Sequence, residues 1–210
     1  MPKAAYPSIR VFENPWLEKM THVHPVIPIL LWAPIVSFLF YRSFAVHGLS
    51  VLTFAWLGIL GLFAWTLTEY LLHRFIFHFT PTTPTQERLE FLMHGLHHAD
   101  PKDPTRLVMP PAGSLILGAI VFSICRGLFG PIWAEPLFGF LVIGYLCYDY
   151  VHYFIHHSNP RTVFGKIVKQ HHMKHHFVTP NARWGVSSPL WDHVFGTLEE
   201  KHERTNEQII

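Results

Sequence analysis

The sequence predicts an all-α integral membrane protein, with four transmembrane helices in two hairpins and a helical cap that carries clustered histidines. Of its 210 residues, 50% are hydrophobic and only 14% are charged, whereas an ordinary soluble protein has about 25% charged residues. Histidine occurs 17 times. A soluble fold of this length would expose much of its apolar surface to water, so we expect one membrane-embedded domain, residues 1–210.

Four long intervals without charged side chains, apart from Glu135 near the start of the last one, define the predicted spans. Each is close to the roughly 20 apolar residues that a membrane-spanning helix needs. We place the spans at about residues 23–42, 48–70, 108–127 and 132–153. Pro25, Pro28 and Pro34 predict that the first helix is kinked or begins late. The sequence opening lacks the layout of a cleavable signal peptide.

The basic residues lie almost entirely outside the two hairpin turns. The turns hold only Arg42 and Arg126, while the other 14 of the 16 Lys and Arg residues lie before the first span, between the second and third, or after the fourth. Because loops rich in Lys and Arg stay on the cytoplasmic side, we expect both termini and the histidine clusters to face the cytoplasm. The predicted cap comprises residues 71–107 and 152–205.

The histidines gather in four segments, at residues 73–78, 94–98, 152–157 and 171–176. Residues at i, i+3 and i+4 share one helical face, so most members of a segment can point together. His73 and His78 lie about 140° apart around an ideal helix, which suits two adjacent ions better than one, unless the helix ends between them. The segments supply ten candidate ligands, enough for two metal ions: His73, His78, His94, His97, His98, His152, His156, His172, His175 and His176.

Two carboxylates, Glu69 and Asp149, each precede a candidate ligand by about one helical turn. Ligand imidazoles usually donate their second N–H to a carboxylate or carbonyl, so we expect this role for both; the alternative is that they cap the water-facing ends of the spans. The remaining histidines are not expected to bind metal: His22, His24, His47, His157, His171, His193 and His202.

Imidazole ligands suit zinc, copper, iron and nickel alike. A structural zinc site usually has four ligands, commonly including Cys, and a site of ten histidines differs from that pattern. Two iron ions would suit the activation of dioxygen, and a purified sample could still carry zinc.

Residues 69–198 resemble the fatty acid hydroxylase and sterol desaturase superfamily of membrane di-iron oxygenases, and within it the fatty acid 2-hydroxylases. The resemblance covers the histidines and the motifs that link them, at residues 69–75, 93–98, 106–111, 148–152, 172–177 and 190–197. It implies an O2-dependent monooxygenase that inserts a hydroxyl group at C2 of a fatty acyl chain, either free or amide-linked in a sphingolipid such as ceramide. It also implies that the ten histidines are the ligands of two iron ions.

Many eukaryotic members of this superfamily carry an N-terminal b-type cytochrome domain. Here about 22 residues precede the first span and contain no haem-binding motif, so we expect a separate electron donor of the cytochrome b5 or ferredoxin type. The basic residues Lys166, Lys169, Lys174 and Arg183 could bind an acidic donor or anionic lipid head groups, and both interpretations stay open.

Three polar residues are candidates for holding the polar head of the substrate, with surface salt contacts as the alternative: Arg106, Asn181 and Arg183. The expected partners are therefore a lipid, dioxygen, the donor protein and the membrane, with no nucleic acid. Other functions remain open. The protein could be a sterol or carotenoid hydroxylase or a desaturase of the same superfamily, or a membrane protein that binds metal without catalysis.

Overall fold

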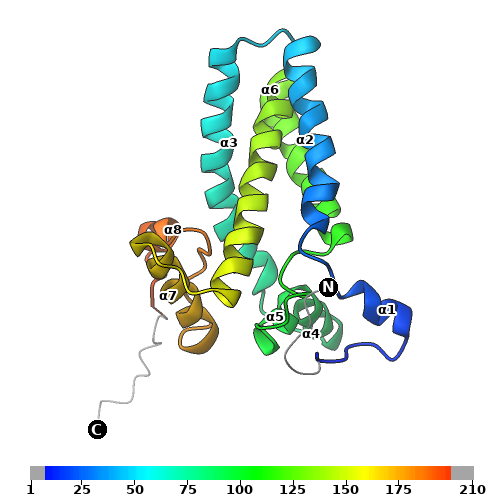
Figure 1. Cartoon of the computed structure of the whole chain (residues 1–210), viewed down its shortest axis with the longest axis vertical. Helices are drawn as coiled ribbons and strands as arrows, with labels where there is room; N and C mark the ends of the chain where they lie inside the picture. The colour runs from blue at the N-terminus through cyan, green and yellow to red at the C-terminus, as the bar shows by residue number, and fades with distance from the viewer. Residues whose placement is uncertain (1–7, 200–210) are drawn as a thin grey trace.

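The computed structural model describes residues 8–199, and every regular element in that range is helical. Long helices form an upright bundle, and the shorter helices gather at one end of it (Figure 1). In chain order the elements are α1 (Pro15–Met20), α2 (Ile27–Ala45), α3 (Val51–Leu71), the π-helix η1 (Leu72–Phe77), α4 (Pro84–Glu90), the π-helix η2 (Phe91–Gly95), α5 (Leu96–Ala99), α6 (Pro111–His157), α7 (Val163–Phe177) and α8 (Leu190–Phe195).

The first hairpin consists of α2 and α3. Helix α2 has Pro28 in its first turn and Pro34 inside it. Proline is tolerated in a first turn, because its missing N–H would have no intrahelical partner there, and the expected late start is confirmed at Ile27. The turn contains Gly48 in the left-handed conformation, with φ 61°. Ser50 then starts α3 by accepting a hydrogen bond from a backbone N–H of the first turn, at 3.1 Å.

The second hairpin lies within α6, whose helical geometry is broken at Gly130 (φ 72°, ψ 170°), directly before Pro131. Phe122 and Phe138 would be about 24 Å apart along a straight helix, from its rise of about 1.5 Å per residue. Their ring centroids are instead 5.1 Å apart, so the chain folds back and the two halves pack together. Figure 1 shows these green and yellow-green halves running in opposite directions.

Helix α6 packs against both α2 and α3 at glycines. A Cβ atom at Gly144 would lie 2.5 Å from Trp65 of α3, and one at Gly139 would lie 2.4 Å from Phe40 of α2. The outward sides expose apolar side chains such as Ile116, which is 63% exposed. Three helical stretches, at residues 27–45, 51–77 and 111–157, are long and apolar enough to cross a membrane. They overlap all four intervals predicted from the sequence.

The histidine-bearing segments lie at the lower end of the bundle (Figure 1). One part consists of α4, η2 and α5, and the other of α7 and α8. Thr83 and Thr162 begin α4 and α7 by accepting hydrogen bonds from backbone N–H groups of the first turns, at 3.3 and 3.1 Å. These caps fix where each helix starts; α7 carries its own histidines, and α4 leads directly into η2 and α5, which carry His94, His97 and His98.

Candidate metal centre

Two compact clusters of five histidines lie side by side where the bundle meets the short helices. In each cluster, one ring nitrogen from every histidine lies within 4.8 Å of those of the other members. Cluster 1 consists of His73, His78, His94, His98 and His175. Cluster 2 consists of His97, His152, His156, His172 and His176. The fold thus brings together all ten histidines singled out from the sequence.

The clusters divide the histidines by helical spacing. The i,i+4 pairs stay together: His94 with His98 in cluster 1, and His152 with His156 and His172 with His176 in cluster 2. The residues at i+3 join the other cluster: His97 belongs to cluster 2 and His175 to cluster 1. In an α-helix, residues four apart are separated by about 40° and residues three apart by about 60° in the opposite sense. The three histidines at 94, 97 and 98 are therefore shared between the two clusters, as are those at 172, 175 and 176. We had expected the members of each set to point together.

The pair His73 and His78 departs from the sequence prediction. Both belong to cluster 1, although five residues of ideal α-helix would set them about 140° apart. The π-helix η1 is the reason. The backbone N–H of His78 donates to the carbonyl of His73, five residues earlier, at 3.2 Å, so the two residues lie one turn apart on the same side. Single π-turns of this kind are frequent at functional sites.

The ring nitrogens of cluster 2 fit a metal ion better than a hydrogen-bonded network. Their Nε2 atoms contact one another in an unbroken series: His152 with His97 at 2.9 Å, His97 with His176 at 3.0 Å, His176 with His172 at 3.0 Å, and His172 with His156 at 2.9 Å. A neutral Nε2 either donates or accepts, so these five atoms can form only two mutual hydrogen bonds. Ligands at right angles around one ion, with metal–nitrogen distances of about 2.1 Å, also lie about 3.0 Å apart.

The protonation states are those that metal binding requires. Burial, reinforced by neighbouring imidazoles, lowers the pKa of His98 to about 2 and that of His78 to about 3. Burial also lowers the pKa of His175 to about 4, and those of His94 and His97 well below the usual value. These side chains are therefore neutral near pH 7, and a neutral imidazole offers a free lone pair to a metal ion. The clusters are able to hold metal ions.

A loop before α8 orients two histidines of cluster 1 through backbone carbonyls. His73 donates from Nδ1 to the carbonyl of Trp184 at 2.5 Å, and His175 donates from Nδ1 to the carbonyl of Ala182 at 2.8 Å. Both Nε2 atoms are thereby left facing the cluster. Carbonyls are common partners for ligand imidazoles. Sequence reasoning missed them, because every residue carries a carbonyl and only the fold shows which one is near.

The carboxylate of Glu69 does not contact His73, contrary to our prediction. Its Oε1 accepts from the backbone N–H groups of Val186 and Ser187, both at 2.7 Å, and its Oε2 accepts from the Ser187 hydroxyl. Glu69 therefore holds the loop that carries the Trp184 carbonyl, and acts on His73 only through that loop.

Asp149 likewise makes no hydrogen bond to His152 among the residues that the structure describes, so the expected direct contact is wrong. The Nδ1 atom of His152 and the Oδ2 atom of Asp149 are both buried without a hydrogen-bond partner within residues 8–199. Asp149 lies one turn after Tyr145 on α6, and its carboxylate interacts with the Tyr145 hydroxyl, although no hydrogen bond of standard geometry joins them within the same range. Polar atoms in this state are costly unless a ligand or water satisfies them.

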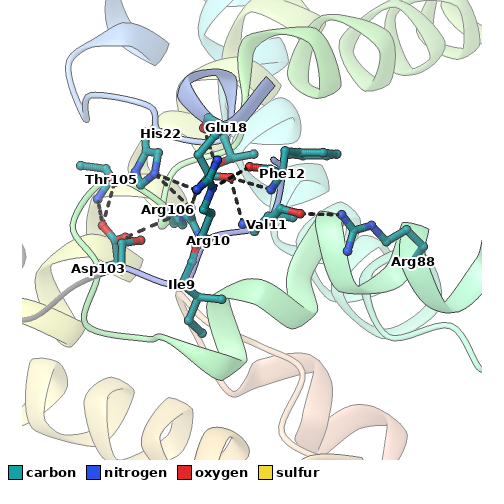
Figure 2. A network of polar contacts seen from close by, with 12 residues as sticks. Ile9, Arg10, Val11, Phe12, Glu18, His22, Arg88, Asp103, Thr105 and Arg106 are labelled. Atoms are coloured by element: carbon teal, nitrogen blue, oxygen red, sulfur yellow. Dashed lines mark hydrogen bonds and ion pairs between the residues drawn. The ribbon is translucent and has the colours of Figure 1, made fainter. Parts of the chain in front are cut away.

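Arg106 is occupied inside the protein and is not free to hold a substrate head group. Its side chain is 2% exposed and pairs with Glu18 at 2.6 Å. It also donates to the carbonyl of Ile9 at 2.6 Å and contacts His22 at 3.0 Å. Figure 2 shows how this network ties the segment before α2 to the loop after α5. A buried guanidinium is costly without partners, and these partners come from distant segments, which a sequence pattern could not reveal.

Arg183 and Asn181 lie near cluster 1. Arg183 stands between the two residues whose carbonyls orient His175 and His73, with φ 62°. Its Nε atom is buried without a partner within the described range. Asn181, two residues earlier, is exposed. Both positions are compatible with the predicted head-group role.

The histidines left out of the metal set lie outside both clusters where the structure describes them. His171 contacts Asp192 at 3.0 Å, and His157 is exposed and donates to its own helix. His22 contacts the Thr105 hydroxyl at 2.6 Å, and His47 contacts Glu135 at 3.1 Å. His202 lies outside the described residues.

An apolar groove lies between the helices of the bundle and has a cavity volume of about 50 Å³. Its lower end is lined by Leu72, directly before His73, and by Met109. The walls come from α2, α3 and both halves of α6, and include Trp32, Trp65, Ser114, Leu117, Gly118, Val121, Phe138, Leu141, Val142 and Tyr145. A long apolar ligand could lie in it with one end next to cluster 1.

A protein-family model described as fatty acid hydroxylase matches residues 58–197, a stretch that contains both histidine clusters and most of the groove. This chain belongs to the fatty acid hydroxylase family. It is accordingly a hydroxylating oxidoreductase.

The chain is also similar to individual hydroxylases over most of its length. A dihydroceramide fatty acyl 2-hydroxylase of Arabidopsis thaliana is 36% identical over 95% of the chain and 84% of its own length. The fatty acid 2-hydroxylase of Homo sapiens is 36% identical over 94% of the chain and 59% of its own length. The solved structure of scs7p, with only its hydroxylase domain visible, matches with a TM-score of 0.84, 37% identity and coverage of 90% of this chain and 72% of that one.

The motif at residues 190–197 contains a buried residue, Asp192, that the sequence analysis did not single out. Its carboxylate accepts from the backbone N–H groups of Trp184 at 2.9 Å and Gly185 at 2.8 Å, and from the Thr197 hydroxyl at 2.7 Å. Burial alone would raise the pKa of Asp192, but these hydrogen bonds and His171 hold it below its usual value. The available signal was the single acidic residue of this short helix.

Proposed function

We propose that this fatty acid hydroxylase uses two iron ions, one in each histidine cluster, to hydroxylate C2 of a fatty acyl chain. The observation that carries the proposal is the presence of two adjoining sets of five convergent imidazoles. Imidazole sites accept several metals, and we favour iron because oxygen-dependent hydroxylation needs a redox-active ion. When bound, the two irons would activate dioxygen and supply the oxidant for the C–H bond.

The relatives support the substrate class. They are named as hydroxylases of dihydroceramide acyl groups, of fatty acids and of very long chain fatty acids of ceramide. We propose the same class here, with the acyl tail in the apolar groove and C2 beside the clusters. Leu72, which lines the groove, directly precedes His73, so in this proposal the carbons nearest the polar head lie at the metal site and those further along lie among the spans.

The protein's own contribution is position and the exclusion of water. His73, His172 and His175 are fully buried, and the loop carbonyls and carboxylates hold the ring orientations described above. For the polar head of the substrate we propose Arg183 and Asn181 at the cap; the Nε atom of Arg183 is buried without a partner within the described residues. A guanidinium and an amide can both form hydrogen bonds with a carboxyl or amide group.

We propose that the four helical stretches, α2, α3 and the two halves of α6, all cross the membrane. The hairpin turns would then face away from the cytoplasm, and the clusters and both termini would face it. The support is the distribution of basic residues, of which only Arg42 and Arg126 lie near the hairpin turns, within the ends of their helices.

Electrons would reach the site from a separate donor protein of the cytochrome b5 or ferredoxin type. We propose that it binds the cap near α7, because Lys166 and Arg161 are exposed there and cluster 2 lies on the inner side of the same helix. Lys169 contributes less free charge, since it donates to the carbonyl of Ser158 at 2.6 Å and to Asn159 at 2.9 Å.

Lipid mass spectrometry of cells that produce the protein tests the proposed function. Cells with the parent protein should accumulate 2-hydroxyacyl lipids, and cells with a His176→Ala variant at matched abundance should not. Accumulation of lipids that have lost two hydrogens would indicate a desaturase instead. Oxygenated sterols or carotenoids would indicate another substrate, and bound metal without any lipid product would indicate a non-catalytic metal protein.

A further inference from the structure

Among the groove-lining residues on the second half of α6, Phe138 lies farthest along the helix from His152. This ring is 5% exposed and lines the groove together with Trp32. The two rings meet edge to face with centroids 6.0 Å apart, and Phe122 packs against Phe138 from the other half of α6 at 5.1 Å. Phe138 therefore has neighbours on two sides that oppose its displacement by a ligand.

A second group of aromatic rings packs between α2, α3 and another face of α6. Phe140 lies 4.8 Å from Phe40 and 5.1 Å from Phe54, measured between ring centroids. A Cβ atom at Gly58 of α3 would lie 2.9 Å from the Phe140 ring, so the ring fills the space that the glycine leaves. This group shares no residue with the groove, and Phe140 lies on a different face of α6 from Phe138.

The length of the groove follows from positions on α6. Phe138 lies fourteen residues before His152, which corresponds to about 21 Å of helix. Val142 and Tyr145 also line the groove, and they follow Phe138 by four and seven residues, so all three face the same side. A bulky side chain at position 142 would end the groove about 6 Å closer to the clusters.

We infer that Phe138 sets the length of acyl chain that this enzyme prefers, by stopping the methyl end of the substrate. The inference rests on the proposed function, because it takes an acyl tail to be the occupant of the groove. A chain that ends below Phe138 fills the groove while its C2 carbon stays beside the clusters. A longer chain must bend out of the groove or withdraw its C2 carbon.

Steady-state kinetics of the metal-loaded protein in lipid nanodiscs test this inference. The substrates are acyl chains that differ only in length, from palmitoyl through stearoyl to lignoceroyl. One or a few methylenes in an apolar pocket change kcat/KM by about tenfold or more. Phe138→Ala and the milder Phe138→Leu should therefore raise kcat/KM for longer chains relative to shorter ones by about tenfold, and Val142→Phe should shift the preference to shorter chains by a similar factor.

Phe140→Ala is the matched control. It removes the same ring from the same helix, but residues two apart do not share a helical face, and Phe140 does not line the groove. It should leave the chain-length preference unchanged. Folding of each variant is checked by its metal content and its elution as a single species.

The kinetics distinguish failure of the inference about Phe138 from failure of the proposed function. If the parent protein hydroxylates acyl chains but the variants at Phe138 and Val142 keep the parent's preference, the inference about Phe138 is overturned and the proposed function stands. An equal loss for all chain lengths has the same meaning. If the metal-loaded parent hydroxylates no acyl chain at all, the proposed function itself fails.

Discussion

Replacing Asp192 tests whether the loop before α8 holds the metal-binding histidines in place. In Asp192→Ala, the backbone N–H groups of Trp184 and Gly185 lose their acceptors. Each buried donor left without a partner costs about 2 kcal/mol, so the variant should lose about 4 kcal/mol of unfolding free energy. For a chain of this size that corresponds to a melting temperature lower by about 8–16 °C.

A graded variant and a surface control sharpen this prediction. Asp192→Asn keeps one oxygen as an acceptor for Trp184 but presents an N–H group to Gly185, so it should lose about 2 kcal/mol. His193→Ala changes the exposed neighbour on α8 and should lose little. The Trp184 carbonyl orients His73, so the Ala variant should also bind metal at cluster 1 about tenfold more weakly.

The assay combines thermal melting in detergent with metal-to-protein ratios after gel filtration. The reasoning is refuted if Asp192→Ala melts and binds metal like His193→Ala. It is also refuted if the Asn variant is as damaged as the Ala variant, because one of the two backbone acceptors is retained there.

Three further predictions follow from the same structure. Replacing His98 or His176 by Ala should abolish hydroxylation and lower metal content, whereas the exposed His157→Ala should change neither; full activity in either of the first two variants would exclude that histidine as a ligand. Arg106→Ala leaves Glu18 without its buried partner and should cost about 3–5 kcal/mol of stability; a stably folded variant with a raised KM alone would restore a head-group role. Metal-stripped protein should lose stability as the pH falls below about 6.5. The histidines of the unfolded chain bind protons in this range, whereas in the folded protein the buried clusters do not, since the pKa of His98 is lowered to about 2. Unfolding midpoints independent of pH would contradict this.

The fold and the ten histidines were predictable because the relevant signals are local in sequence. Charge-free intervals reflect the thickness of the membrane, and a histidine at i+3 or i+4 is placed by helical geometry alone. The departures have equally definite causes. The π-turn at η1 changes the angular step between His73 and His78, and no propensity in the segment distinguishes it from an α-turn.

The residues around the site were less predictable, because their roles depend on contacts between distant segments. Glu69 contacts residues more than a hundred positions later, and Arg106 pairs with Glu18 across eighty-eight positions. From the sequence, both charged side chains seemed free to contact a ligand histidine or a substrate. In the fold, both bind other segments of the protein instead. The carbonyls of Ala182 and Trp184 carry no side-chain signal at all.

The most direct test of the central claim is the fate of oxygen atoms during turnover. Purified protein loaded with iron, in nanodiscs containing ceramide, is supplied with an electron donor and isotopically heavy dioxygen, and the product acyl chain is fragmented in a mass spectrometer. The account predicts one heavy oxygen atom per product, located at C2. A product whose new oxygen comes from water, or the absence of any hydroxylated acyl chain when both histidine clusters hold iron, would contradict it.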